Sequence, residues 1–93
     1  MTVRFIPTLT GRIVEIHEAD VFATDWTLDE AIERVGRIGF EAQEYAEEAL
    51  LAHQTGHGDP AAFVAGANQR IAMAHALMAA IAKFGLSVEA SAA

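Results

Sequence analysis

The second half of this chain contains a run of twelve residues, Ile71 to Ala82, that carries no formal charge. In the wider segment 60–84 the only charged side chains are Arg70 and Lys83. A surface helix normally has a polar side that faces water, and this segment has too few polar residues to form one. A helix here should therefore be buried on more than one side. A chain of 93 residues offers little to bury it against, so a second copy or another protein is the expected cover.

Length and composition limit the kind of protein that this can be. The chain fits one domain over residues 1–93, and a domain this short is marginally stable unless it is cross-linked or oligomeric. It has no cysteine, which excludes disulfides and thiolate metal sites. The uncharged run is shorter than the roughly 20 apolar residues that span a bilayer, and no signal peptide is apparent at the N-terminus. We therefore expect a cytoplasmic protein.

Acidic residues are concentrated in the first half of the chain. Residues 15–48 hold eleven acidic side chains and two arginines, and the net charge of the whole chain is −7. Phosphate backbones and anionic lipids attract lysine and arginine. The composition therefore argues against nucleic acid and membranes as partners, and it favours a protein with a basic surface.

Residues 2–17 are expected to form a β-hairpin. Two segments rich in Val, Ile, Phe and Thr flank Thr10-Gly11, a pair that fits a turn. Pro7 has no amide hydrogen to donate, so the first strand should lie at an edge of the sheet. The stretch 18–26 is interpreted as a polar and aromatic loop.

Two long helices are expected after this loop. The first, over residues 28–53, begins at a Thr-Leu-Asp-Glu capping box. The second, over residues 60–84, begins at Asp-Pro, which are good N-cap and N1 residues, and leaves 87–93 as a tail. A short Gly-rich turn joins the two helices, so they should pack antiparallel as a helical hairpin.

Each helix has an apolar stripe at helical spacing. The stripe of the first helix is Leu28, Ile32, Val35, Gly39, Ala42, Ala46, Ala49 and His53. The stripe of the second helix is Val64, Ala67, Ile71, Ala74, Met78 and Ile81. Because a lone helical hairpin cannot enclose a core, the β-hairpin or a second subunit must cover the side that is left open.

The fold class predicted from these patterns is α+β and mainly helical. An N-terminal β-hairpin packs on a long antiparallel helical hairpin, and two copies dimerise into a four-helix bundle through the second helix. The predicted dimer interface consists of Phe63, Ile71, Met73, Leu77, Met78, Ile81 and Phe84.

An acidic face on the first helix is the best candidate for contact with another protein. No lysine or arginine follows Arg37 on this helix to pair with its carboxylates. Glu44 and Glu48 are four residues apart, so they lie on the same helix face and repel each other. The face either keeps the protein soluble or binds a basic surface. The predicted partner-binding residues are Glu41, Glu44, Glu47 and Glu48, together with the loop aromatics Phe22 and Trp26.

Other patterns give little support for catalysis or metal binding. His53 and His57 have a spacing found in zinc sites, but glycine interrupts the helix between them. His17 is interpreted as one half of a solvated pair with Glu15, and His75 as a residue hydrogen-bonded within or beside the core. We therefore predict no catalytic residue, no metal and no cofactor.

The segment Asn68-Gln-Arg-Ile-Ala-Met-Ala-His75-Ala-Leu-Met-Ala, in an Ala-rich acidic chain, is similar to helices in small acidic proteins of actinobacterial phages. This resemblance implies a non-enzymatic protein that binds a host protein and redirects or inhibits it. We therefore expect a protein–protein interaction module. The alternatives are a structural homo-oligomer and a metal-dependent helical enzyme that uses Glu44, Glu48 and His53.

Overall fold

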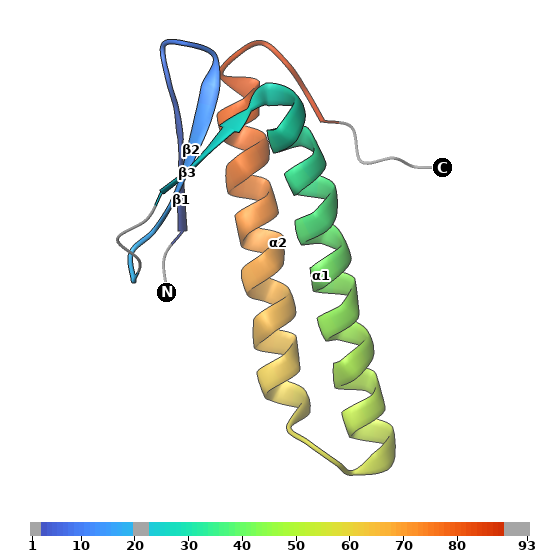
Figure 1. Cartoon of the computed structure of the whole chain (residues 1–93). Helices are drawn as coiled ribbons and strands as arrows, with labels where there is room; N and C mark the ends of the chain where they lie inside the picture. The colour runs from blue at the N-terminus through green and yellow to red at the C-terminus, as the bar shows by residue number, and fades with distance from the viewer. Residues whose placement is uncertain (1–2, 20–22, 89–93) are drawn as a thin grey trace.

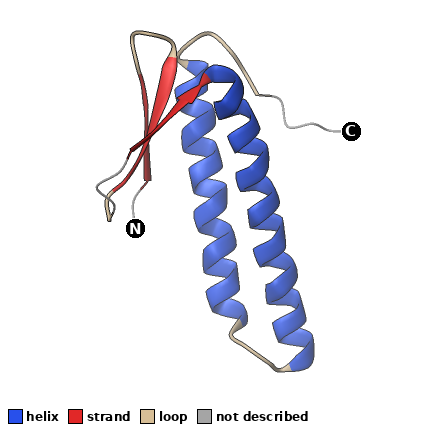
Figure 2. Ribbon diagram, viewed as in Figure 1, coloured by secondary structure: helices blue, strands red, loops and turns tan. Residues whose placement is uncertain are grey.

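A three-stranded sheet packs against one end of a long helical hairpin (Figure 1, Figure 2). The computed structural model describes residues 3–19 and 23–88. The antiparallel sheet has the order β1-β2-β3, and the two helices run antiparallel beside it. The elements are β1 (Val3–Pro7), β2 (Arg12–His17), β3 (Ala23–Thr27), α1 (Leu28–Thr55) and α2 (Pro60–Ala82). The predictions of an α+β, mainly helical class and of a helical hairpin are confirmed.

The N-terminal β-hairpin forms as predicted. Its strands are β1 and β2, and residues between Pro7 and Arg12 form the turn. β1 pairs antiparallel with β2, and Pro7 lies opposite Ile13 at the end of the ladder. β1 is an edge of the sheet, so the missing amide hydrogen of Pro7 takes no bond from a neighbouring strand. Gly11 has φ of 78° in the turn, a conformation that glycine adopts without steric cost.

The third strand corrects the sequence interpretation, which placed a loop over 18–26. The segment Ala23–Thr27 pairs antiparallel with β2, and Trp26 lies opposite Ile13. Arg12 Nε lies 2.9 Å from Asp25 Oδ1 and links the two strands. The segment Ala-Thr-Asp-Trp-Thr does not alternate between apolar and polar residues, and its first three residues are exposed. It is a strand because it pairs with the second edge of β2, and this pairing with residues 7 to 15 positions earlier leaves no repeat within the segment itself.

The capping signals place both helices correctly to within two residues. The Thr27 hydroxyl accepts from the Glu30 amide, and the Glu30 carboxylate accepts from the Thr27 amide. α1 then continues to Thr55 and ends at Gly56, which has φ of 72°. At the start of α2 the Asp59 side chain accepts from an amide of the first turn.

The core lies between the sheet and the half of the hairpin that the sheet covers. The largest fully buried side chains are Ile13 of β2, Ile38 of α1, and Leu77 and Ile81 of α2. The far half of the hairpin, which ends at residues 56–59, extends beyond the sheet (Figure 1). The sheet therefore supplies much of the cover that the uncharged run of α2 needs.

The sheet also changes which stripe of each helix is buried. The buried residues of α1 are Ala31, Val35, Ile38, Ala42, Ala49 and Ala52. The buried residues of α2 are Ala67, Met73, Ala74, Leu77, Ala80 and Ile81. The predicted stripes are thus only partly correct: Ile32, Val64 and Ile71 remain exposed. The core is displaced toward the sheet, so one flank of both predicted stripes is left uncovered.

Two glycines within the helices give a matched test of this packing. A Cβ at Gly66 of α2 would lie 2.8 Å from the Tyr45 ring of α1, whereas a Cβ at Gly36 would meet nothing within 4 Å. We expect Gly36→Ala to raise the free energy of unfolding by about 0.5–1 kcal/mol through helix propensity. Gly66→Ala should be at least about 1 kcal/mol less stable than Gly36→Ala because the helices must separate. Urea unfolding measures both, and equal stabilisation would show that Tyr45 moves aside freely.

Candidate functional site

The predicted acidic face divides into parts with different surroundings. Glu41 is tied to both arginines beside it: its Oε2 lies 3.2 Å from Arg70 Nε of α2, and its Oε1 lies 3.9 Å from Arg34 Nη1. The sequence pattern missed Arg70 as a partner because it is 29 residues away along the chain. The charge of Glu41 is therefore largely compensated within the chain.

Glu44 and Glu48 line an open depression between the two helices. Glu41, Tyr45, Phe63 and Arg70 also line it, and its volume is 340 Å³. The Arg70 guanidinium lies 5.2 Å from the centre of the Tyr45 ring, within the range of a cation–π contact. Two carboxylates beside aromatic rings form a setting suited to a basic side chain.

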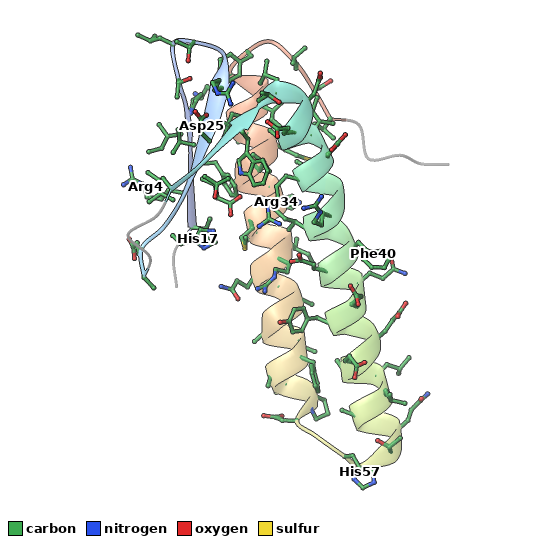
Figure 3. All side chains as sticks on the ribbon, in the orientation of Figure 1. Arg4, His17, Asp25, Arg34, Phe40 and His57 are labelled. Carbon is green, nitrogen blue, oxygen red and sulfur yellow. The ribbon has the colours of Figure 1, made fainter. Side chains whose placement is uncertain are left out.

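The outer edge of α1 carries two large apolar residues that the sequence analysis left aside. Phe40 is 62% exposed and Leu51 is 52% exposed. Their spacing from Glu44 and Glu47 is that of one helix face, and Phe40 points away from α2 in Figure 3. This spacing was available in the sequence. We call Phe40, Glu44, Glu47 and Leu51 the outer stripe.

A buried carboxylate joins the sheet to α1. Glu15 of β2 is only 3% exposed. Arg34 of α1 donates from Nε to Glu15 Oε1 at 3.2 Å and from Nη2 to Oε2 at 3.3 Å. Trp26 Nε1 donates to Oε1 at 3.1 Å, and His17 Nε2 donates to Oε2. Figure 3 shows Arg34 between the hairpin and the sheet. The solvated Glu15–His17 pair of the sequence analysis is thus a buried one.

The partners of Glu15 hold it in the ionised form. Burial alone would raise the pKa of this carboxyl, but hydrogen bonds from Arg34 and His17, the charge of Arg34 and the Trp26 indole outweigh it. The net effect lowers the pKa below its usual value of 4.5. Each oxygen of the Glu15 carboxylate accepts two hydrogen bonds, so this side chain connects the sheet to α1.

Of the two aromatic residues predicted to contact a partner, Trp26 and Phe22, the structure describes only Trp26. Trp26 packs against the core, and its indole is engaged by Glu15. Trp26 therefore has partners within its own chain, and no second protein is needed to account for it. Phe22 lies outside the described residues.

The residues predicted for a dimer interface also lie in two environments. Leu77, Ile81 and Met73 are buried in the core of the single chain, and Phe84 packs against that core. Phe63 and Met78 are half-buried, and Ile71 is 45% exposed. Within the single chain, Ile71 is therefore at the surface, whereas Leu77 and Ile81 lie in the core.

A groove of 450 Å³ runs between α1 and α2 beside Ile71. Its floor and walls include small residues of both helices, among them Gly39, Ala46 and Ala67. Of the described residues that line it, none carries a formal charge and none belongs to a strand. It therefore lies on a side of the hairpin that the sheet does not cover.

The histidines and carboxylates do not gather into a metal site in the described part of the chain. Among residues 3–19 and 23–88, no three His, Asp or Glu side chains are close enough to hold a metal ion. The set Glu44, Glu48 and His53 is thus not assembled by the fold. His75, which was expected within or beside the core, is exposed and lines the groove.

No protein-family model, curated protein or solved structure matches the chain. Over the residues that the structure describes, neither helix is both long enough and apolar enough to cross a membrane. Function must therefore be argued from the surfaces described above.

The buried carboxylate predicts how stability depends on pH. Since the folded-state pKa of Glu15 is below 4.5, its ionised form adds stability above that pH. This contribution is lost as the pH falls through the folded-state pKa. We expect Glu15→Gln to lower the free energy of unfolding by about 2 kcal/mol at neutral pH.

The difference in the free energy of unfolding between Glu15→Gln and the wild type should shrink as the pH falls from about 5 through the folded-state pKa of Glu15. Urea unfolding at several pH values measures it. Glu18→Gln is the matched control, because Glu18 lies nearby and is exposed. Parallel pH profiles for the wild type and Glu15→Gln would contradict this assignment.

Proposed function

We propose that this protein is a non-enzymatic protein–protein interaction module that binds a basic surface of another protein. The outer stripe of α1 and the adjoining Glu48 form the contact surface. The observation that carries the proposal is the exposure of Phe40 and Leu51 on the same helix face as Glu44 and Glu47. Aromatic residues are enriched in protein interfaces, so an exposed Phe40 among carboxylates is a candidate anchor for a basic partner.

The charge of the chain supports the same proposal. With a net charge of −7, the protein attracts basic partners at long range, which speeds and orients association. Glu41 is compensated by Arg70 and Arg34. Glu44, Glu47 and Glu48 have no ion pair within the described residues, so they are the carboxylates that offer charge to a partner.

Capture of partners from an actinobacterial lysate tests this surface, and the choice of lysate follows from the sequence resemblance. We expect proteins retained by the immobilised wild type to be lost with Glu44→Lys and reduced with Phe40→Ser. Glu18→Lys is the control, because it changes the net charge by the same amount as Glu44→Lys at an exposed position in the turn after β2. Retention should also fall as salt is added. If all variants capture the same proteins, the outer stripe is not the contact surface.

A second candidate function is that of a structural homodimer in which two helical hairpins form a four-helix bundle. Its support is the uncharged groove between α1 and α2, which the sheet leaves open. A hairpin whose second side is uncovered gains stability by burying that side against another hairpin.

Solution mass tests this second function. We expect a dimer by sedimentation at micromolar concentrations, and a thermal unfolding midpoint that rises with protein concentration because folding is coupled to association. A monomer whose midpoint does not change with concentration would contradict it.

A further inference from the structure

One face of the hairpin combines large exposed side chains with a groove whose described lining contains no acidic residue, arginine or lysine. Ile71 of α2 lines the groove and is exposed. Ile32 and Leu50 of α1 and Val64 of α2 are also exposed, and each lies three or four residues along its helix from a residue that lines the groove. Between them lie small residues, including Ala46 and Ala67. We call these four large residues and the groove between them the open face. The polar side chains that line the groove are Gln43 and His75.

We propose that the open face is the surface on which a second copy of this chain binds, with the two copies related by a two-fold axis. This inference deepens the homodimer function and rests on it. Each hairpin would place its large side chains against the groove of its partner, as in the interdigitated packing of four-helix bundles. In a two-fold dimer the same surface of each copy meets itself, so that surface must carry both protruding side chains and a groove that receives them. The open face carries both.

Charge identifies the occupant as a second copy. A heterologous basic partner would find no carboxylate within the groove, and the attraction from the net charge of −7 would act elsewhere. Two copies of such an acidic chain repel each other wherever their carboxylates meet. The outer stripe places Glu44 and Glu47 in any contact. The groove is lined by uncharged side chains, and the carboxylate next to it is that of Glu47, which accepts a hydrogen bond from Gln43 at 3.3 Å.

Shape and area agree with this occupant. The Cα radius of gyration is 15.0 Å, whereas a compact domain of this length has about 12 Å. The chain exposes 6310 Å², and a typical monomer of 9.9 kDa exposes about 5,200 Å². The surplus of roughly 1,100 Å² exceeds the approximately 800 Å² that one partner buries in a standard interface. The chain as a whole therefore exposes enough surface for an interface of standard size.

A single carboxylate on the open face tests the proposal. We expect Ile71→Glu to weaken dimerisation by about 100-fold or more, because each dimer would bury two unpaired charges. Ala72→Glu is the matched control: it adds the same charge to the same helix at the next residue, which is exposed and does not line the groove. Sedimentation equilibrium measures both, and circular dichroism verifies that each variant is folded.

A second pair of variants keeps the test independent of the folding of Ile71→Glu. Gln43→Glu adds charge to the groove from α1, and Gln54→Glu adds it at an exposed position outside the groove. We expect only the first to weaken the dimer.

The results separate the two proposals. A wild type that is monomeric up to about 100 µM, well above the dissociation constant of a stable dimer, would overturn both the homodimer function and the open face. A wild-type dimer that is weakened by Phe40→Ser but not by Ile71→Glu or Gln43→Glu would overturn the open face alone.

Discussion

The burial of the sheet against one side and one end of the helical hairpin is the contact on which the rest of this structure depends. Ile13 of β2 joins Ile38, Leu77 and Ile81 in the only cluster of large side chains that are fully buried within the described residues. The hairpin alone could not enclose a core, because two helices touch along a single line. The sheet supplies the third side, and the position of the sheet then decides which surfaces remain open.

A buried ion pair helps to define that position. Glu15 on the sheet and Arg34 on α1 meet in a two-pronged contact, and Trp26 and His17 complete the hydrogen bonds of the carboxylate. Buried ion pairs add little stability relative to well-packed apolar residues, because both charges lose water. Breaking one is costly, however, so the pair penalises any other placement of the sheet. We therefore regard it as a determinant of how the sheet is oriented on the hairpin.

The fold separates charged and uncharged surface on the same two helices. The outer edge of α1 carries carboxylates beside Phe40 and Leu51, whereas the groove between the helices has no charged residue among its described lining. These surfaces are suited to different partners. A charged stripe attracts an oppositely charged protein, while an uncharged groove can pair with its own copy without bringing like charges together. The two proposed interactions use different sides of α1 and do not exclude each other.

Local signals in the sequence determined the helices and the first two strands. The capping box at Thr27, the Asp59-Pro60 start and the glycine at position 56 act within a few residues, so they can be recognised without knowledge of the fold. The concentration of acidic residues in the first half of the chain was equally plain.

Tertiary structure decided everything that depends on residues far apart in the chain. β3 exists because β2 offers an edge, Glu41 is compensated because Arg70 lies across the hairpin, and Glu15 is buried because α1 covers it. The helices have apolar stripes wider than one neighbour can bury, and periodicity cannot tell which part the sheet will cover. Burial is a property of the assembled layers, so only the fold could place Leu77 in the core and leave Ile71 in solvent.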